Sequence, residues 1–296
     1  MKNIQLFLRT GGRNWKILLL SFSLIIVSVP AGAQTDTIVL RDIQWDTAAR
    51  AGSTELFIPS EGALMAGFIY RANGSQKHPT LILLHGYPGN ERNLDLAQAI
   101  RVHGWNVIYF DYRGSWGSQG QFSFENCVQD AINTVAFCKK YTDSLRIDTS
   151  NIVLFGHSMG GWVCLKALAA LPGIQKGFAL STWNIYGDFK NVTPAQLTAL
   201  AADPGNGMSY FVLNTPVEKI FTPVLNNLSY YNLQNETGLV SKQIIMLDEH
   251  TGNKHLAEAL RKNNQKYFEY EVWPTDHGFT NKRISLINKV IAFLNK

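Results

Sequence analysis

One serine of the chain stands between glycines at the spacing that serine nucleophiles use. The stretch "FGHSMGGW" (residues 155–162) places Ser158 two residues after Gly156 and two before Gly160, directly behind the apolar run "NIVLF". The string alone is weak evidence, because a chain of this length contains a G-x-S-x-G by chance about once in ten. The alternative is the small-residue start of an ordinary buried helix.

The elements around Ser158 decide between these readings. The apolar run before it predicts a strand, and "MGGWVCLKALAAL" after it predicts a helix. A nucleophilic serine needs this strand-to-helix turn, with glycines where side chains would clash with the neighbouring strand and helix. At the amino end of such a helix, the free N–H groups and the positive end of the helix dipole point toward an oxyanion formed at the serine. We therefore expect Ser158 to be a nucleophile.

A serine hydroxyl needs a base, and the base needs a carboxylate to orient it. In a strand–turn–helix arrangement of this kind both partners follow the serine in the chain. His277, in "PTDHGFT", comes after the last expected strand and before the closing helix, where the base belongs. His157 is expected to point away from the active-site face, and His250 and His255 leave little room for an acid before them.

The acid should follow the strand "QIIML", where Asp248 and Glu249 stand side by side. Adjacent residues on an emerging strand point to opposite sides, so only one of them can face His277. We favour Asp248, with Glu249 as the alternative and Asp188 as a third candidate.

An oxyanion hole requires two backbone donors. One is expected from Met159, directly after the nucleophile, and the second from Tyr87 in the loop "HGYPGN". The proline and glycine of that loop can serve turn geometry at the same time.

The elements that position these residues alternate between strand-like and helix-like segments. This alternation predicts an α/β fold with a mostly parallel central sheet flanked by helices. Residues 54–60 and 64–72 are expected to form an edge hairpin, and residues 90–104 a helix capped by Asn90 and ended by Gly104.

Residues 184–240 interrupt this alternation. They contain helix-like pieces such as "TPAQLTALAA" but no strand of the sheet, which predicts a small helical cap insertion. The cap's aromatic residues could form an apolar acyl pocket or could simply pack the cap onto the sheet. These residues are Tyr186, Tyr210, Phe211, Phe221, Tyr230 and Tyr231.

The N-terminal 33 residues have the composition of a targeting segment. Four basic residues precede the apolar run "ILLLSFSLIIVSV" and the small residues "AGA". This predicts a signal peptide over residues 1–33, a single α/β domain over residues 34–296, and a secreted or periplasmic protein. The alternative is an uncleaved anchor, although the apolar run is shorter than the roughly 20 residues of a spanning helix.

Removing that segment lowers the net charge from +5 to +1, since it holds four of the 27 basic and none of the 22 acidic residues. No basic run remains, so no nucleic-acid partner is expected, and membrane contact is expected only through an uncleaved N-terminal segment. The three cysteines are expected to be buried free thiols. No cofactor or metal is implied.

The motifs "HGYPGN", "FDYRGSWGS", "GHSMGG" and "TDHGF", in this order, resemble those of the α/β-hydrolase superfamily. Within it, residues 54–296 are similar to the catalytic domain of the prolyl oligopeptidase family. The resemblance implies Ser158 as nucleophile, His277 as base, an acid after the seventh strand, and Tyr87 and Met159 as oxyanion donors. That family's β-propeller has no counterpart in this chain, so its peptidase activity does not carry over.

The expected function is that of an exported serine hydrolase that cleaves carboxylic esters through an acyl-enzyme on Ser158. Its substrate would be a small-molecule ester, an amide or a short peptide. Two alternatives remain: an aminopeptidase or acyl-peptide hydrolase, and a catalytically inactive α/β-hydrolase that serves as a binding module.

Overall fold

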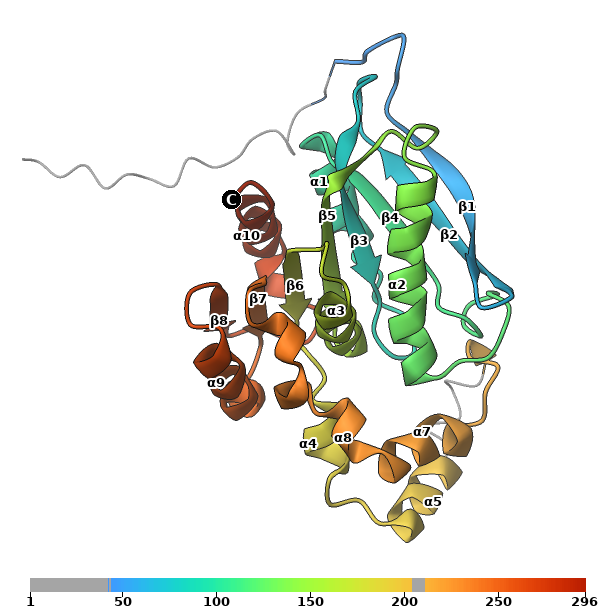
Figure 1. Ribbon diagram of the computed structural model, residues 1–296, viewed down its shortest axis with the longest axis vertical. Helices are drawn as coiled ribbons and strands as arrows, with labels where there is room; N and C mark the ends of the chain where they lie inside the picture. The colour runs from blue at the N-terminus through green and yellow to red at the C-terminus, as the bar shows by residue number, and fades with distance from the viewer. Residues whose placement is uncertain (1–41, 43, 204–210) are drawn as a thin grey trace, which may run out of the picture. The chain divides into compact units, whose positions relative to one another are not determined.

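The computed structural model describes residues 42, 44–203 and 211–296, so the predicted signal peptide at residues 1–33 lies outside the described residues. Eight strands form one sheet in the order β1-β2-β4-β3-β5-β6-β7-β8 (Figure 1). β1 and β2 form the expected antiparallel edge hairpin, β2 pairs antiparallel with β4, and the remaining pairs are parallel. The strands are β1 (Gly52–Ser60), β2 (Ala63–Arg71), β3 (His78–Leu84), β4 (Asn106–Phe110), β5 (Ile147–His157), β6 (Lys176–Leu180), β7 (Gln243–Asp248) and β8 (Phe268–Val272).

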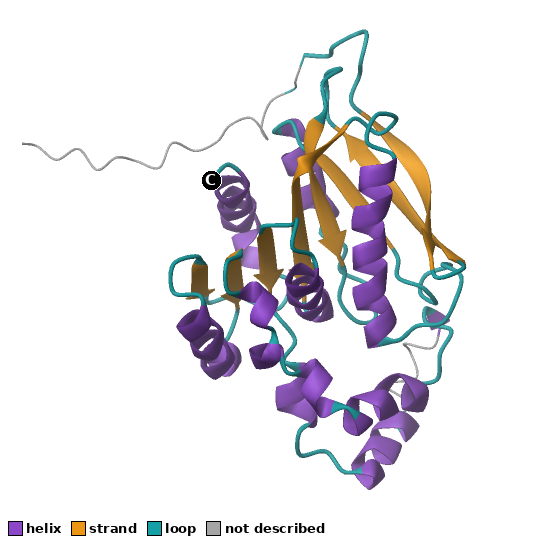
Figure 2. Ribbon diagram, in the orientation of Figure 1, coloured by secondary structure: helices purple, strands orange, loops and turns teal. Residues whose placement is uncertain are grey.

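Helices cover both faces of this sheet (Figure 2). One face packs against α2 and α3, and the other against α1 and α10. The central strands are therefore buried on both sides, which explains why they read as continuous apolar runs in the sequence. The predicted α/β architecture is confirmed. The helices are α1 (Leu94–Val102), α2 (Phe124–Lys140), α3 (Met159–Ala170), α9 (Lys254–Asn263) and α10 (Arg283–Leu294).

The start of α1 differs from the expectation. The helix begins at Leu94, and the residue before it is the buried Asn93 in a left-handed conformation (φ 54°), so the prediction of Asn90 as its cap was wrong. The loop after β3 therefore extends from residue 85 to Asn93, three residues further than expected. Gly104, with φ 87°, follows the helix end as expected.

Between β6 and β7 the chain forms only short helices in its described part. Those within residues 185–231 lie beyond the carboxyl ends of the parallel strands, at the bottom of Figure 1. Thr193 and Gln196 form a reciprocal capping box at the start of α5, with Pro194 as its first residue. These helices are α4 (Ile185–Phe189), α5 (Pro194–Ala202), α7 (Val217–Asn226), α8 (Leu228–Tyr231), η3 (Leu233–Asn235) and η4 (Thr237–Leu239).

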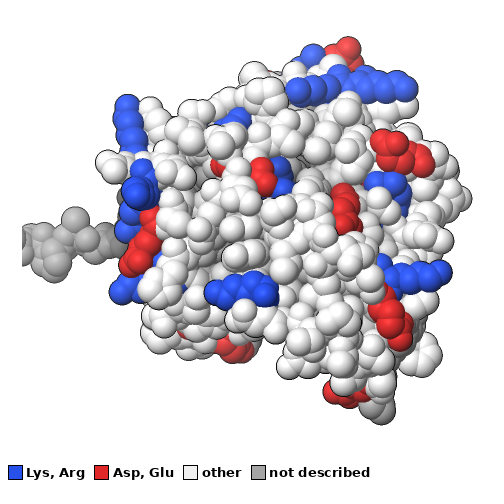
Figure 3. Space-filling view, turned by 60° about the horizontal axis from the view of Figure 1, so that its bottom comes forward, with Lys and Arg blue, Asp and Glu red and all other residues white. Residues whose placement is uncertain are grey.

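Three further observations complete the fold. Cys127, Cys138 and Cys164 are buried free thiols, as expected. No helix within the described ranges is long and apolar enough to cross a membrane. On the face shown in Figure 3, basic and acidic side chains are interspersed.

Candidate active site

Ser158 occupies a sharp turn between β5 and α3. Its backbone has φ 60° and ψ −120°, a combination that non-glycine residues rarely adopt. The turn is held from both sides, because the Ser158 N–H donates to the Leu180 carbonyl at 2.8 Å and the Ser158 carbonyl accepts the Trp183 N–H at 3.0 Å. The surrounding sheet thus stabilises the strained conformation predicted for a nucleophile.

The glycines around Ser158 are required by close backbone packing. A Cβ on Gly156 would lie 1.9 Å from the Gly160 carbonyl oxygen, and a Cβ on Gly160 would lie 1.9 Å from the Leu84 carbonyl oxygen. A Cβ on Gly86 would lie 3.0 Å from the Ser158 Cβ. A side chain at Gly156 or Gly160 would therefore clash with fixed backbone, and one at Gly86 would be crowded against Ser158.

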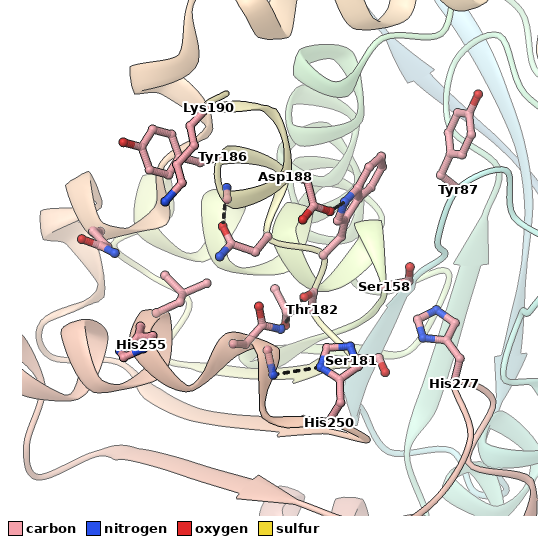
Figure 4. Close-up of a pocket in the computed structure, with 17 residues that line it drawn as sticks. Tyr87, Ser158, Ser181, Thr182, Tyr186, Asp188, Lys190, His250, His255 and His277 are labelled. Atoms are coloured by element: carbon pink, nitrogen blue, oxygen red, sulfur yellow. Dashed lines mark hydrogen bonds between the residues drawn. The ribbon is translucent and has the colours of Figure 1, made fainter. Parts of the chain in front are cut away.

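His277 lies beside Ser158, and both line the same pocket (Figure 4). The Nδ1–H of His277 donates to the Oε1 of Glu249 at 2.8 Å. Glu249 also accepts a hydrogen bond from the hydroxyl of Ser181. Burial alone would raise the pKa of Glu249, but the hydrogen bonds from Ser181 and His277 outweigh burial and lower it. An ionised Glu249 fixes the tautomer of His277 and leaves Nε2 unprotonated.

Asp248 does not face His277, so the preference for Asp248 over Glu249 as its partner was wrong. Asp248 is the last residue of β7 and is fully buried, with its Oδ1 accepting the Thr182 N–H at 3.2 Å. Burial raises the pKa of Asp248 to about 6. The two carboxylates do point to opposite sides, as strand geometry requires, but the first residue beyond the strand is the one that reaches His277.

The third acid candidate, Asp188, is also placed away from His277. It lies on α4, and its carboxylate accepts the indole N–H of Trp183 at 2.8 Å. Asp188 lines the pocket, but its carboxylate binds the indole of Trp183 rather than His277.

Both expected oxyanion donors belong to elements that border the serine. Met159 is the first residue of α3, where helix geometry provides no intrahelical acceptor for the N–H. Tyr87 follows β3 in the loop that Gly86 brings against Ser158, and it lines the pocket.

The pocket beside Ser158 has a volume of about 670 Å³. Tyr186 and Lys190 line it on the side away from Ser158 and His277 (Figure 4). Asn184 and Asn253 also contribute polar side chains to its lining. His250 and His255 line it as well, and His250 Nε2 lies 3.8 Å from Glu249 Oε1.

The aromatic residues of the cap mostly pack rather than line this pocket. Tyr186 lines it, whereas Phe221 and Tyr231 are buried in the core and Phe211 is 87% exposed. Tyr230 stacks with Lys166 instead, with Nζ 3.8 Å from the ring centroid. Tyr210 lies outside the described residues. Packing, the second of the two roles considered for these residues, therefore describes most of them.

His157 makes a contact that the sequence did not indicate. As expected it points away from the Ser158 side of the turn, but it is buried beneath the loop that carries His277, with the two ring centroids 4.9 Å apart. His157 Nε2 lies 2.9 Å from the His277 carbonyl oxygen. Its position beside the nucleophile was the only available signal.

Comparison with known proteins finds similarity over the segment that contains Ser158. A family model described as "Serine aminopeptidase, S33" matches residues 75–216. Cutinase 1 of Thermobifida cellulosilytica is 26% identical over 128 residues, which cover 43% of this chain and 48% of the cutinase. The chain spans less than half the length of this and the other leading curated relatives.

Solved structures extend the likeness to most of the chain. An esterase of Pyrococcus furiosus superposes with a TM-score of 0.59 at 20% identity, covering 83% of this chain and 92% of the esterase. A hyperthermophilic esterase of Pyrobaculum calidifontis gives 0.60 at 14% identity, covering 87% of each chain. The chain has the α/β-hydrolase fold. The superfamily resemblance of the motifs is thus confirmed at the level of the fold.

Proposed function

We propose that the protein is a serine hydrolase that cleaves carboxylic esters through an acyl-enzyme on Ser158. The observation that carries the proposal is one arrangement: Ser158 on a strained turn, His277 beside it, and Glu249 hydrogen-bonded to His277 Nδ1 at 2.8 Å. In the proposed site Glu249 replaces Asp248 as the acid.

Each group has a defined role in the proposed reaction. Ser158 Oγ attacks the ester carbonyl while His277 Nε2 takes its proton, and Glu249 stabilises the imidazolium that forms. The amides of Met159 and Tyr87 donate to the oxyanion. The C–O bond to the alcohol then breaks, and His277 returns the proton to the leaving oxygen. Water attacks the acyl-enzyme by the same sequence and releases the acid and free Ser158.

The proposed substrates are esters with a short or polar acyl or alcohol group. Cutinases and esterases among the related proteins favour ester chemistry over other reactions of the fold. Asn184, Lys190 and Asn253 in the lining of the pocket offer polar groups to the substrate, which favours a hydrogen-bonding acyl or alcohol group over a long alkyl chain.

Two measurements test this proposal. A fluorophosphonate probe should label the purified protein and should not label Ser158→Ala. In a series of nitrophenyl esters, kcat/KM should be highest for acetyl to butyryl esters and at least tenfold lower for dodecanoyl. Labelling that persists in Ser158→Ala, or no turnover of any ester together with no labelling, would contradict the hydrolase; a maximum at dodecanoyl would contradict the substrate class.

Aminopeptidase activity is the second candidate, since the matching family model is described as a serine aminopeptidase. A peptidase activity is also what a resemblance to the prolyl oligopeptidase catalytic domain would suggest. Asp188 is the pocket carboxylate that could receive a substrate ammonium group. Turnover of aminoacyl nitroanilides that exceeds turnover of the esters, and is lost in Asp188→Asn, would favour this candidate. The absence of both labelling and turnover of either series would favour a catalytically inactive binding module.

Export through a signal peptide over residues 1–33 completes the proposal. Amino-terminal sequencing of the protein recovered from the exported fraction should begin at Gln34. A mature protein that still begins at Met1 would contradict cleavage.

A further inference from the structure

The loop that carries His277 is held from beneath by a second histidine. His157 is 2% exposed, and its Nε2 lies 2.9 Å from the carbonyl oxygen of His277. Because a carbonyl oxygen only accepts, Nε2 must carry the hydrogen. In a neutral ring the other nitrogen, Nδ1, is then an acceptor.

The acceptor nitrogen of His157 has a matching donor. Asn93 Nδ2 lies 3.4 Å from His157 Nδ1. The orientation of the Asn93 amide is fixed by its other end, since Oδ1 accepts a hydrogen bond from Arg283 Nη1 at 3.1 Å. The direction of every bond from the guanidinium to the His277 carbonyl is therefore determined.

Arg283 contacts the same loop a second time. Its Nη1 also donates to the carbonyl oxygen of Gly278, the residue after His277, at 3.1 Å. The guanidinium is anchored in turn on Asp95 of α1, with Nε donating to Oδ2 at 2.8 Å. Two successive carbonyls of the loop are thus bound to a network that extends to two helices.

We infer that His157 is a positioning residue for His277: its Nε2–H bond to the His277 carbonyl sets the backbone from which the imidazole reaches both Ser158 and Glu249. The inference rests on the proposed function, because it assigns the base of that reaction to His277. Glu249 fixes only the rotation of the ring, so the placement of the His277 backbone needs a separate restraint, and His157 with Arg283 supplies it.

The charge state of His157 agrees with this role. Burial, with a smaller contribution from the neighbouring His277, lowers the pKa of His157 to about 4. The ring is therefore neutral near pH 7, the form in which Nδ1 can accept from Asn93.

A matched set of substitutions tests the role. In His157→Gln the terminal Nε2 can reach the position of the imidazole Nε2 and donate to the His277 carbonyl. In His157→Asn the side chain reaches only the position of Nδ1, so that bond is lost. A misplacement of about 1 Å at a reacting group costs on the order of 100-fold in rate. We expect kcat of His157→Gln to stay within threefold of wild type and kcat of His157→Asn to fall by roughly 10- to 100-fold. KM should stay within twofold of wild type in both variants.

The readouts separate positioning from simple packing. The rate of fluorophosphonate labelling should fall in His157→Asn as kcat does, and it should stay near that of wild type in His157→Gln. Thermal denaturation compares the stability of the two variants. Long-range ¹H–¹⁵N NMR spectra of the wild type should assign the Nε2–H tautomer to His157. His103→Asn, at the end of α1, is the control for a histidine outside the site.

The possible outcomes are distinct. Wild-type kcat in His157→Asn, or equal losses of kcat in Asn and Gln that follow equal losses of stability, would overturn the positioning role while leaving the hydrolase intact. A wild-type protein that neither labels nor turns over esters would overturn the proposed function, and the role of His157 with it. A kcat near that of wild type in His157→Gln but not in His157→Asn, at unchanged KM, supports the inference.

Discussion

At the scale of single residues, the two neighbouring carboxylates have opposite environments. Glu249 lies just beyond β7, partly exposed, and accepts hydrogen bonds from His277 and Ser181. Asp248 ends the strand, is fully buried and does not line the pocket. Two adjacent residues thus have different surroundings: Glu249 contacts the proposed base, whereas Asp248 belongs to the core.

Substituting the two carboxylates separately should give opposite effects on activity. Glu249→Gln removes the charge that holds the His277 tautomer, so kcat should fall by about 10³-fold or more. Asp248→Asn keeps an acceptor for the Thr182 N–H and should stay within threefold of wild type. Steady-state kinetics on a nitrophenyl ester measures both, and a larger loss of kcat in Asp248→Asn would contradict the assignment.

Asp248 should also affect stability in a pH-dependent manner. Its pKa is raised to about 6 in the folded state, so the folded state binds the proton more tightly than the unfolded chain does. Its contribution to the free energy of unfolding is therefore fully favourable only below pH 4 and is lost as pH rises through 6.

Asp248→Asn removes the buried charge at neutral pH. Its free energy of unfolding should exceed that of wild type by up to about 3 kcal/mol at pH 7.5, and the difference should vanish near pH 4. Urea denaturation of both proteins at the two pH values measures the difference. A constant difference at both pH values would contradict the raised pKa.

At the scale of the elements, the turn from β5 into α3 depends on backbone contacts that leave no space for side chains. Gly160 is packed against the end of β3, and Gly156 against the first turn of α3. The same packing accompanies the close approach of the loop after β3 to Ser158, so the strand–helix contact and the proposed oxyanion site depend on the same backbone contacts.

Gly160→Ala should therefore disrupt both stability and the site. Its Cβ would lie 1.9 Å from the Leu84 carbonyl oxygen, which belongs to the sheet and cannot move freely. We expect the free energy of unfolding of Gly160→Ala to be lower than that of wild type by about 3 kcal/mol or more. Gly173→Ala is the matched control, since its Cβ would meet only Lys139 Nζ at 3.6 Å. Thermal and urea denaturation compare the two, and equal stability would contradict the packing argument.

At the scale of the whole molecule, the cap is joined to the sheet by buried aromatic and polar contacts. Tyr231 of α8 stacks on Trp162 of α3, with ring centroids 5.4 Å apart, and its hydroxyl donates to Glu125 of α2. Lys166 of α3 pairs with Glu236, whose segment follows η3. The cap residues therefore complete the core that α2 and α3 begin.

Tyr231 should show how much of this attachment is packing and how much is hydrogen bonding. Tyr231→Phe keeps the stacked ring but removes the hydrogen bond to the Glu125 carboxylate. Its free energy of unfolding should be lower than that of wild type by about 1–3 kcal/mol. Tyr231→Ala leaves a cavity against Trp162 and should lose about 3–5 kcal/mol. Equal losses in the two variants, measured by chemical denaturation, would indicate that the ring contributes little.

The sequence alone determined the α/β architecture, the turn at Ser158 and the histidine that lies beside it. These follow from local patterns: apolar periodicity, small residues at a strand-to-helix turn, and the order of motifs along the chain. The limits of α1 were less well predicted, because Asn93 adopts a left-handed conformation that composition does not reveal.

Only the tertiary structure decided which carboxylate meets His277, what lines the pocket, and what lies beneath the His277 loop. Asp248 and Glu249 are equivalent in the sequence, and their difference arises from where β7 ends against its neighbours. The bond from His157 to the His277 carbonyl joins residues 120 positions apart. Side-chain orientation and long-range contact depend on how the sheet packs as a whole. The sequence could therefore propose Ser158 and His277, but it could not decide between Asp248 and Glu249 or reveal the contact with His157.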